Sequence, residues 1–181
     1  MRSKLRIFKR QLPLLIIWAV LSTLIWSWIF MLATEPNARY RLVIAVDGAV
    51  TDATNLAASL EKFKHGDIQR VKVYPFSYAM MDSSTLEKAD LLILPFGDMN
   101  TYLDWLAPLP DNLASEHSGR INGIAYGLPL KSTLVLQHLS GNADDWFVCL
   151  GQKSVHAGFE PGQDTEALSY LTRMSSAVSA E

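Results

Sequence analysis

Residues 40–46 read YRLVIAV, and this stretch decides the fold because it changes from mixed to continuously apolar. Apolar and β-branched residues without alternation are typical of a strand that is buried on both faces. Asp47 and Gly48 follow and break the pattern, so the strand is expected to end there. A strand of this kind belongs in a sheet that carries a packed layer on each side.

A helical pattern follows this first strand. Three apolar side chains recur at helical spacing, namely Leu56, Leu60 and Phe63. Either Thr51 or Asp52 has the side chain to cap the helix at its start. The pattern ends before Gly66, which predicts a helix of about 12 residues.

Two further strands and a short helix complete the first half of the domain. Residues 70–75 (RVKVYP) alternate, and residues 91–94 (LLIL) are continuously apolar, so both predict strands. Between them, Ser84 and Glu87 have capping-box spacing, and Leu86 and Ala89 then point inward. Strands that alternate with helices through short connections predict an α/β fold with right-handed crossovers and a mainly parallel sheet.

The rest of the chain continues the same class of fold. Asp98 can cap a short helix that carries Met99, Tyr102 and Leu106, and residues 111–120 resemble a loop. Residues 123–130 and 146–150 predict later strands, and a last helix begins at Asp164. We therefore expect a single three-layer α/β lobe at residues 40–181.

The amino terminus has a different character. Residues 12–33 form an uncharged apolar stretch, and about 20 such residues are enough for a helix to cross a bilayer. Five basic residues precede the stretch: Arg2, Lys4, Arg6, Lys9 and Arg10. Because basic residues beside a span favour the cytoplasmic side, residues 1–11 are expected in the cytoplasm and the domain outside it.

These features predict a single-pass protein of the cell membrane. Residues 12–33 contact membrane lipid, residues 34–39 form a tether, and residues 40–181 form the extracytoplasmic domain. A cleaved signal peptide is the alternative, but its apolar region is usually about 7 to 15 residues long. The length therefore favours a retained anchor.

The charge distribution excludes one class of partner. The chain has 16 basic and 18 acidic residues. Outside the first eleven residues, 11 basic groups remain against 18 acidic ones, a net charge of −7. Such a domain repels a phosphate backbone, so we expect no binding of nucleic acid.

Several stretches in their order resemble one protein family. Residues 89–98 (ADLLILPFGD), then YLDWLAPLPDNL, then residues 120–130 (RINGIAYGLPL) are similar to bacterial extracellular solute-binding proteins of ABC importers. That family has the type 2 periplasmic-binding fold, in which two lobes clamp a solute. Only residues 132–145 separate YGLPL from the later strand WFVCL, where the family builds its second lobe. The resemblance therefore implies a single lobe on a membrane anchor.

The sequence lacks the common motifs of phosphate binding, zinc proteases, serine hydrolases and calcium loops. We therefore expect a protein that is not an enzyme and has no cofactor. Four histidines lie far apart, without the spacing of metal ligands, so surface positions and no metal site are expected: His65, His117, His138 and His156. Cys149, the only cysteine, is flanked by apolar residues and predicts a small buried side chain rather than a nucleophile paired with His156.

Ligands of an open parallel sheet meet the carboxyl ends of its strands. The residues at those ends, with one tyrosine of a later strand, form the candidate binding site: Asp47, Phe76, Ser77, Tyr78, Phe96, Asp98 and Tyr126. Aromatic faces, a hydroxyl and carboxylates suit a sugar, a peptide or a protein partner. A structural role also fits each one, since Asp47 can form a turn, Asp98 can cap a helix, and the phenylalanines can cover the edge.

The expected function is recognition of a protein partner or ligand by this extracytoplasmic lobe. A single lobe cannot enclose a small molecule as pockets generally do, which favours a protein partner. The alternative is a solute-capture subunit of an ABC importer, in contact with its permease and completed by a second chain.

Overall fold

The computed structural model describes residues 2–34, 37–48, 50, 52–64, 66–77, 86–142 and 145–176. The chain divides into two units, Met1–Pro36 and Asn37–Glu181. The first unit is the helix α1 (Arg2–Thr34). Its stretch Leu12–Phe30 has a mean hydropathy of 2.0 over 19 residues, so it is long and apolar enough to cross a membrane. An anchor and a signal sequence both fit this finding.

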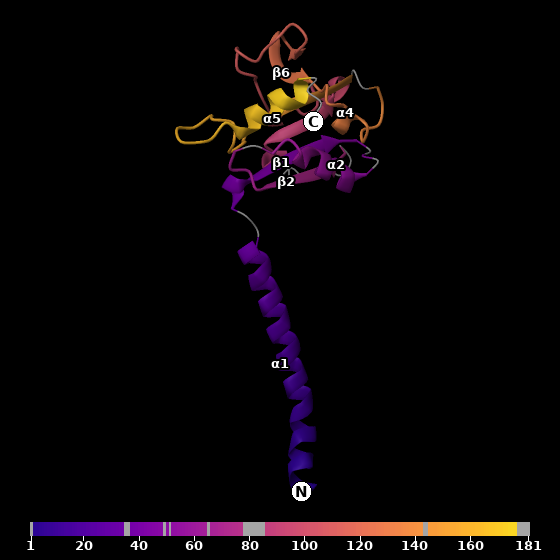
Figure 1. Ribbon diagram of the computed structural model, residues 1–181, viewed down its shortest axis with the longest axis vertical. Coiled ribbons are helices and arrows are strands. Elements are labelled where there is room, and N and C mark those ends of the chain that lie inside the picture. The colour runs from indigo at the N-terminus through magenta and orange to yellow at the C-terminus, as the bar shows by residue number, and fades with distance from the viewer. Residues whose placement is uncertain are drawn as a thin grey trace. The chain divides into compact units, whose positions relative to one another are not determined.

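The second unit is built on one seven-stranded sheet (Figure 1). Its strands are β1 (Arg41–Asp47), β2 (Arg70–Phe76), β3 (Leu91–Pro95), β4 (Leu106–Ala107), β5 (Gly119–Ile121), β6 (Ile124–Pro129) and β7 (Trp146–Gly151). The order is β2-β1-β3-β7-β6-β5, and β4 also pairs with β7.

The first three strands are parallel, as the alternation of strands with helices along the sequence predicted. β7 enters antiparallel between β3 and β6 and also pairs antiparallel with β4. As a result β1, β2, β3, β4 and β6 point in one direction, and β5 and β7 point in the other. The α/β fold class and the mostly parallel open sheet are thereby confirmed.

Helices cover one face of the sheet. α2 (Ala53–Glu61) packs against β2, and α5 (Glu166–Ser175) packs against β6 and β7 (Figure 1). The short α4 (Thr133–Leu136) lies beside α2. These elements bury a large cluster that includes Leu42, Ile44, Leu56, Tyr170 and Leu171. Leu56, Leu60 and Phe63, the apolar side chains expected at helical spacing after the first strand, are therefore all in the core.

The other face is covered by the 3-10 turns η3 (Phe96–Asp98) and η4 (Leu103–Trp105) and by residues 86–89. Met99, Tyr102 and Leu106 are buried there, as predicted, but they do not share one helix, because Met99 follows η3, Tyr102 precedes η4 and Leu106 begins β4. Asp98 is the last residue of η3 and caps no helix, because the chain after it continues in turns and η4 rather than in an α-helix. Leu86 and Ala89 are also buried, whereas Ser84 lies outside the described residues.

Local signals placed the boundaries of several elements well. Asp52 caps α2, and its carboxylate accepts hydrogen bonds of 3.0 Å from the N–H groups of Thr54 and Asn55. Asp164 precedes α5, and its side chain accepts a hydrogen bond of 3.2 Å from the N–H of Glu166. Three short elements had no sequence prediction, namely η1 (Ala38–Tyr40), β4 and α4. β5 lies in a region that resembled a loop.

Candidate functional site

The carboxyl ends of β1, β2 and β3 meet at one edge of the sheet, as their parallel directions require. Asp47 and Phe76, the last residues of β1 and β2, are partners in the strand register. The N–H of Gly48 donates a hydrogen bond of 3.0 Å to the carbonyl of Phe76. We call the five described candidate residues at this edge the strand-end surface: Asp47, Phe76, Ser77, Phe96 and Asp98.

Tyr102, which sequence patterns assigned only to the core, connects two members of this surface. It is fully buried, and its ring meets that of Phe76 edge to face, with centroids 5.3 Å apart. Its hydroxyl donates a hydrogen bond to the carboxylate of Asp47. The signal that could have found it is a tyrosine at a core position, because a buried hydroxyl usually has a polar partner.

Asp47 is a buried carboxylate at this edge, with 7% of its surface exposed. Burial raises its pKa above the ordinary value, and the nearby charge of Asp98 raises it further. Hydrogen bonds from the Tyr102 hydroxyl and the Gly48 N–H lower the pKa, but less than burial raises it. Asp47 is therefore held in a site that favours the neutral acid more than water does.

Phe96 and Asp98 form the exposed part of the surface. Half of Phe96 is exposed, and its ring packs at a tilt against Phe147 with centroids 5.5 Å apart. Asp98 is exposed two residues later, and a side chain at the intervening Gly97 would meet no atom within 4 Å. An apolar ring and a carboxylate are thus presented together to the surroundings.

The remaining candidate residues are placed differently. Ser77 is half-buried directly after β2. Tyr126 lies in the first half of β6, which β7 separates from β3, and its ring packs against the core cluster of the turn-covered face. The structure therefore does not bring Tyr126 to the strand-end surface. Tyr78 lies outside the described residues.

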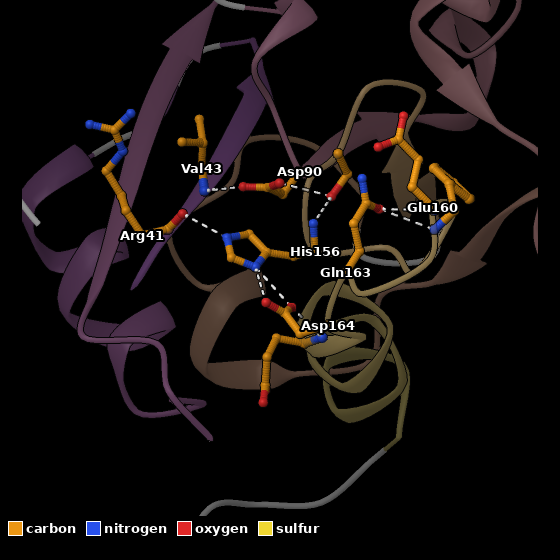
Figure 2. A network of polar contacts seen from close by, with 10 residues as sticks. Arg41, Val43, Asp90, His156, Glu160, Gln163 and Asp164 are labelled. Carbon is orange, nitrogen blue, oxygen red and sulfur yellow. Dashed lines mark hydrogen bonds and ion pairs between the residues drawn. The ribbon is translucent and has the colours of Figure 1, made fainter. Parts of the chain in front are cut away.

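A second polar cluster at the opposite ends of the strands was not predicted (Figure 2). Its centre is His156, which is fully buried, so the expected surface position is wrong. The ring nitrogen Nδ1 lies 2.8 Å from a carboxylate oxygen of Asp164, and Nε2 lies 3.2 Å from the carbonyl oxygen of Arg41. The carbonyl oxygen of Arg41 can only accept a hydrogen bond, so Nε2 is the donor in that contact, and Nδ1 faces the carboxylate of Asp164.

Asp90 and Ser154 extend this cluster. Asp90 is buried, and its carboxylate accepts hydrogen bonds of 2.8 Å from the N–H of Val43 and from the hydroxyl of Ser154. The Ser154 oxygen in turn accepts a hydrogen bond of 3.1 Å from the N–H of His156. Burial raises the pKa of Asp90, although these hydrogen bonds and the charge of His156 oppose the rise.

The types of residue in this cluster suggest a serine, histidine and aspartate triad, but their geometry does not. A triad needs the serine hydroxyl to donate to the histidine ring. Here the Ser154 hydroxyl donates to Asp90, and the two ring nitrogens of His156 contact Asp164 and Arg41. The cluster therefore joins the starts of β1, β3 and α5 rather than activating a nucleophile (Figure 2).

The structure offers neither an exposed thiol at Cys149 nor, in its described part, a set of metal ligands. Cys149 is fully buried in β7, as predicted, and burial raises the pKa of its thiol. Within the described residues, no group of three histidine, cysteine or acidic side chains could hold a metal ion. His117 is exposed, His138 is half-buried, and His65 lies outside the described residues.

The fold and the site define an α/β protein with one apolar helix before it. The chain matches no protein-family model, and no curated protein matches it. Among solved structures, thiaminase I from Bacillus thiaminolyticus, which has a periplasmic-binding-protein-like fold, is similar with a TM-score of 0.36 and 20% identity. The likeness covers 50% of this chain and 28% of that one.

These comparisons correct two expectations. Membership of the solute-binding family is not supported. The comparisons support only a distant structural neighbour with a periplasmic-binding-like fold. The expectation of a protein that is not an enzyme is overturned, because the solved neighbour is an enzyme. Missing sequence motifs were thus an insufficient ground for excluding catalysis, and the likeness itself assigns no reaction to this chain.

Proposed function

We propose that this chain is a membrane-anchored binding protein whose α/β domain recognises a protein partner through the strand-end surface. The anchor is the apolar stretch Leu12–Phe30, which has the length and composition of a membrane span. The basic residues before it favour a cytoplasmic amino terminus and an extracytoplasmic domain.

The observation that carries the proposal is the exposure of Phe96 at the carboxyl end of β3. An aromatic ring that is half exposed, supported from below by Phe147, is typical of the anchors of protein interfaces. Asp98 beside it is exposed and supplies a charge that can pair with a basic group of the partner. The partner surface that fits has an apolar pocket next to a basic side chain.

A protein partner fits this surface better than a small solute. Small-molecule sites generally enclose about 70–90% of their ligand, whereas Phe96 and Asp98 lie on an exposed edge. A sugar or peptide would need a second chain to close the site, which is the arrangement that an importer subunit requires.

Cross-linking in intact cells tests the proposal. A photoreactive phenylalanine analogue replaces Phe96 in the full chain, and the matched control places it at Phe159, an exposed phenylalanine elsewhere on the domain. We expect a specific cross-linked product from position 96 only, and Asp98→Lys in the same chain should weaken it.

The identity of the product separates the alternatives. A cross-link to a second copy of the chain, or to a permease, would favour the importer subunit. The same products from positions 96 and 159, or none from position 96, would refute recognition through this surface.

A further inference from the structure

A basic groove lies at the opposite ends of the strands from the strand-end surface. Its volume is about 320 Å³, and it is lined by Arg41, Val43, Glu87, Lys88, Asp90, Lys153 and Val155. Arg41 begins β1, Asp90 directly precedes β3, and Lys153 follows β7, which runs in the opposite direction. The groove therefore opens at the amino ends of the parallel strands.

The strand register adds a further positive charge beside the groove. Arg41 of β1 is the direct partner of Arg70 of β2. Partner residues on neighbouring strands project from the same face, so the two guanidinium groups leave the sheet side by side. Like charges in directly opposite positions destabilise a strand pair, and an anion bound near them would offset the repulsion.

The backbone and the side chain of Arg41 face different surroundings. Its carbonyl accepts from His156, whereas its guanidinium points away from that ring (Figure 2). In the part of the chain that the structure describes, its buried Nε atom has no hydrogen-bond partner. A buried donor without an acceptor is costly, and an anion in the groove would satisfy it.

The acidic residues of the groove are already engaged. Glu87 forms an ion pair of 3.3 Å with Lys153. The carboxylate of Asp90 is buried and accepts from the Val43 N–H and the Ser154 hydroxyl. Among the described residues, no carboxylate pairs with Arg41 or Lys88, which leaves these two charges for an anionic ligand.

We propose that this basic groove binds the phosphate group of an anionic phospholipid headgroup. Guanidinium and ammonium groups are the usual protein partners of phosphate. Residues 35–40 alone connect the end of α1 to Arg41, so the covalent chain limits their separation to about 25 Å. The inference therefore rests on the membrane anchor of the proposed function, but not on the strand-end surface.

Reconstitution of the full chain in lipid nanodiscs tests the inference. One preparation contains phosphatidylcholine alone, the second contains equal parts of phosphatidylcholine and phosphatidylglycerol, and the third is the first with inorganic phosphate added. Acetylation rates of Lys88 and Lys153 are measured by mass spectrometry. Lys131, which is exposed after the carboxyl end of β6, is the internal reference.

We expect phosphatidylglycerol to slow acetylation of Lys88 and Lys153 at least about threefold relative to Lys131, because anionic headgroups hold nearby basic side chains. Arg41→Gln should remove most of this protection, and Arg70→Gln provides a second variant with an exposed side chain. Equal rates in both lipid mixtures would overturn the inference. Protection by inorganic phosphate alone would overturn the lipid source.

Failure of the anchor gives a different result. A chain that does not elute with the nanodiscs would refute the membrane anchor itself, and with it the lipid assignment. Unchanged lysine rates in a chain that does insert would refute only the groove.

Discussion

His156 is the residue whose removal should reveal most about the stability of this domain. The substitution His156→Ala deletes a fully buried ring that contacts Asp164 and Arg41. Loss of a buried side chain of this size costs about 2–4 kcal/mol through lost packing and the remaining cavity. The carbonyl of Arg41 also loses its donor from the ring, which costs about 1 kcal/mol more.

One effect reduces this sum. The side chain of Asp164 is 32% exposed, so water can replace its lost partner. We therefore expect His156→Ala to lower the free energy of unfolding by about 3 kcal/mol and Tm by roughly 10 °C.

Urea unfolding of the full chain in detergent micelles measures the effect, with the change in tryptophan fluorescence, to which the buried Trp146 contributes, as the signal. His117→Ala removes an exposed histidine and is the matched control, with an expected change within about 0.5 kcal/mol. His156→Gln can still donate one hydrogen bond, so its free energy of unfolding should lie between those of His156→Ala and His117→Ala. Equal stability of His156→Ala and His117→Ala would show that the buried network does not hold the strand starts together.

Three further predictions concern other parts of the domain. Gly151→Ala should destabilise the domain by more than about 2 kcal/mol, because a Cβ would collide with the carbonyl of Ala89. Gly97→Ala adds a Cβ in open space and should change the free energy of unfolding by no more than about 0.5 kcal/mol. Equal urea midpoints for the two variants would contradict this prediction. The free energy of unfolding of Asp47→Asn, relative to that of the native chain, should increase as pH rises from 4 to 7. The reason is that the raised pKa of Asp47 in the folded state makes ionisation of the native carboxyl oppose folding. A difference that shrinks as pH rises would contradict this prediction. The thiol of Cys149 should resist a thiol reagent in the folded protein and react fully in urea, and stoichiometric labelling without urea would show that the centre of the sheet opens.

Much of the strand-end surface could be predicted because it follows from local patterns. The continuous apolar runs of β1 and β3 and the alternation of β2 placed three strand ends, and parallel strands bring such ends to one edge. Asp47, Phe76 and Phe96 were found in this way. Tyr102 was placed only in the core, because its bond to Asp47 depends on the turn that folds back over the sheet.

The sequence by itself determined the apolar helix, the α/β class and the ends of the first strands, because hydrophobic periodicity and capping side chains act over a few neighbouring residues. The tertiary structure alone decided the insertion of β7 beside β3, the burial of His156 and the basic groove. His156 and Arg41 are 115 positions apart, and Arg41 meets Arg70 only through the register of β1 and β2. Such contacts arise from strand pairing and packing between distant segments, and no local pattern in the chain encodes them.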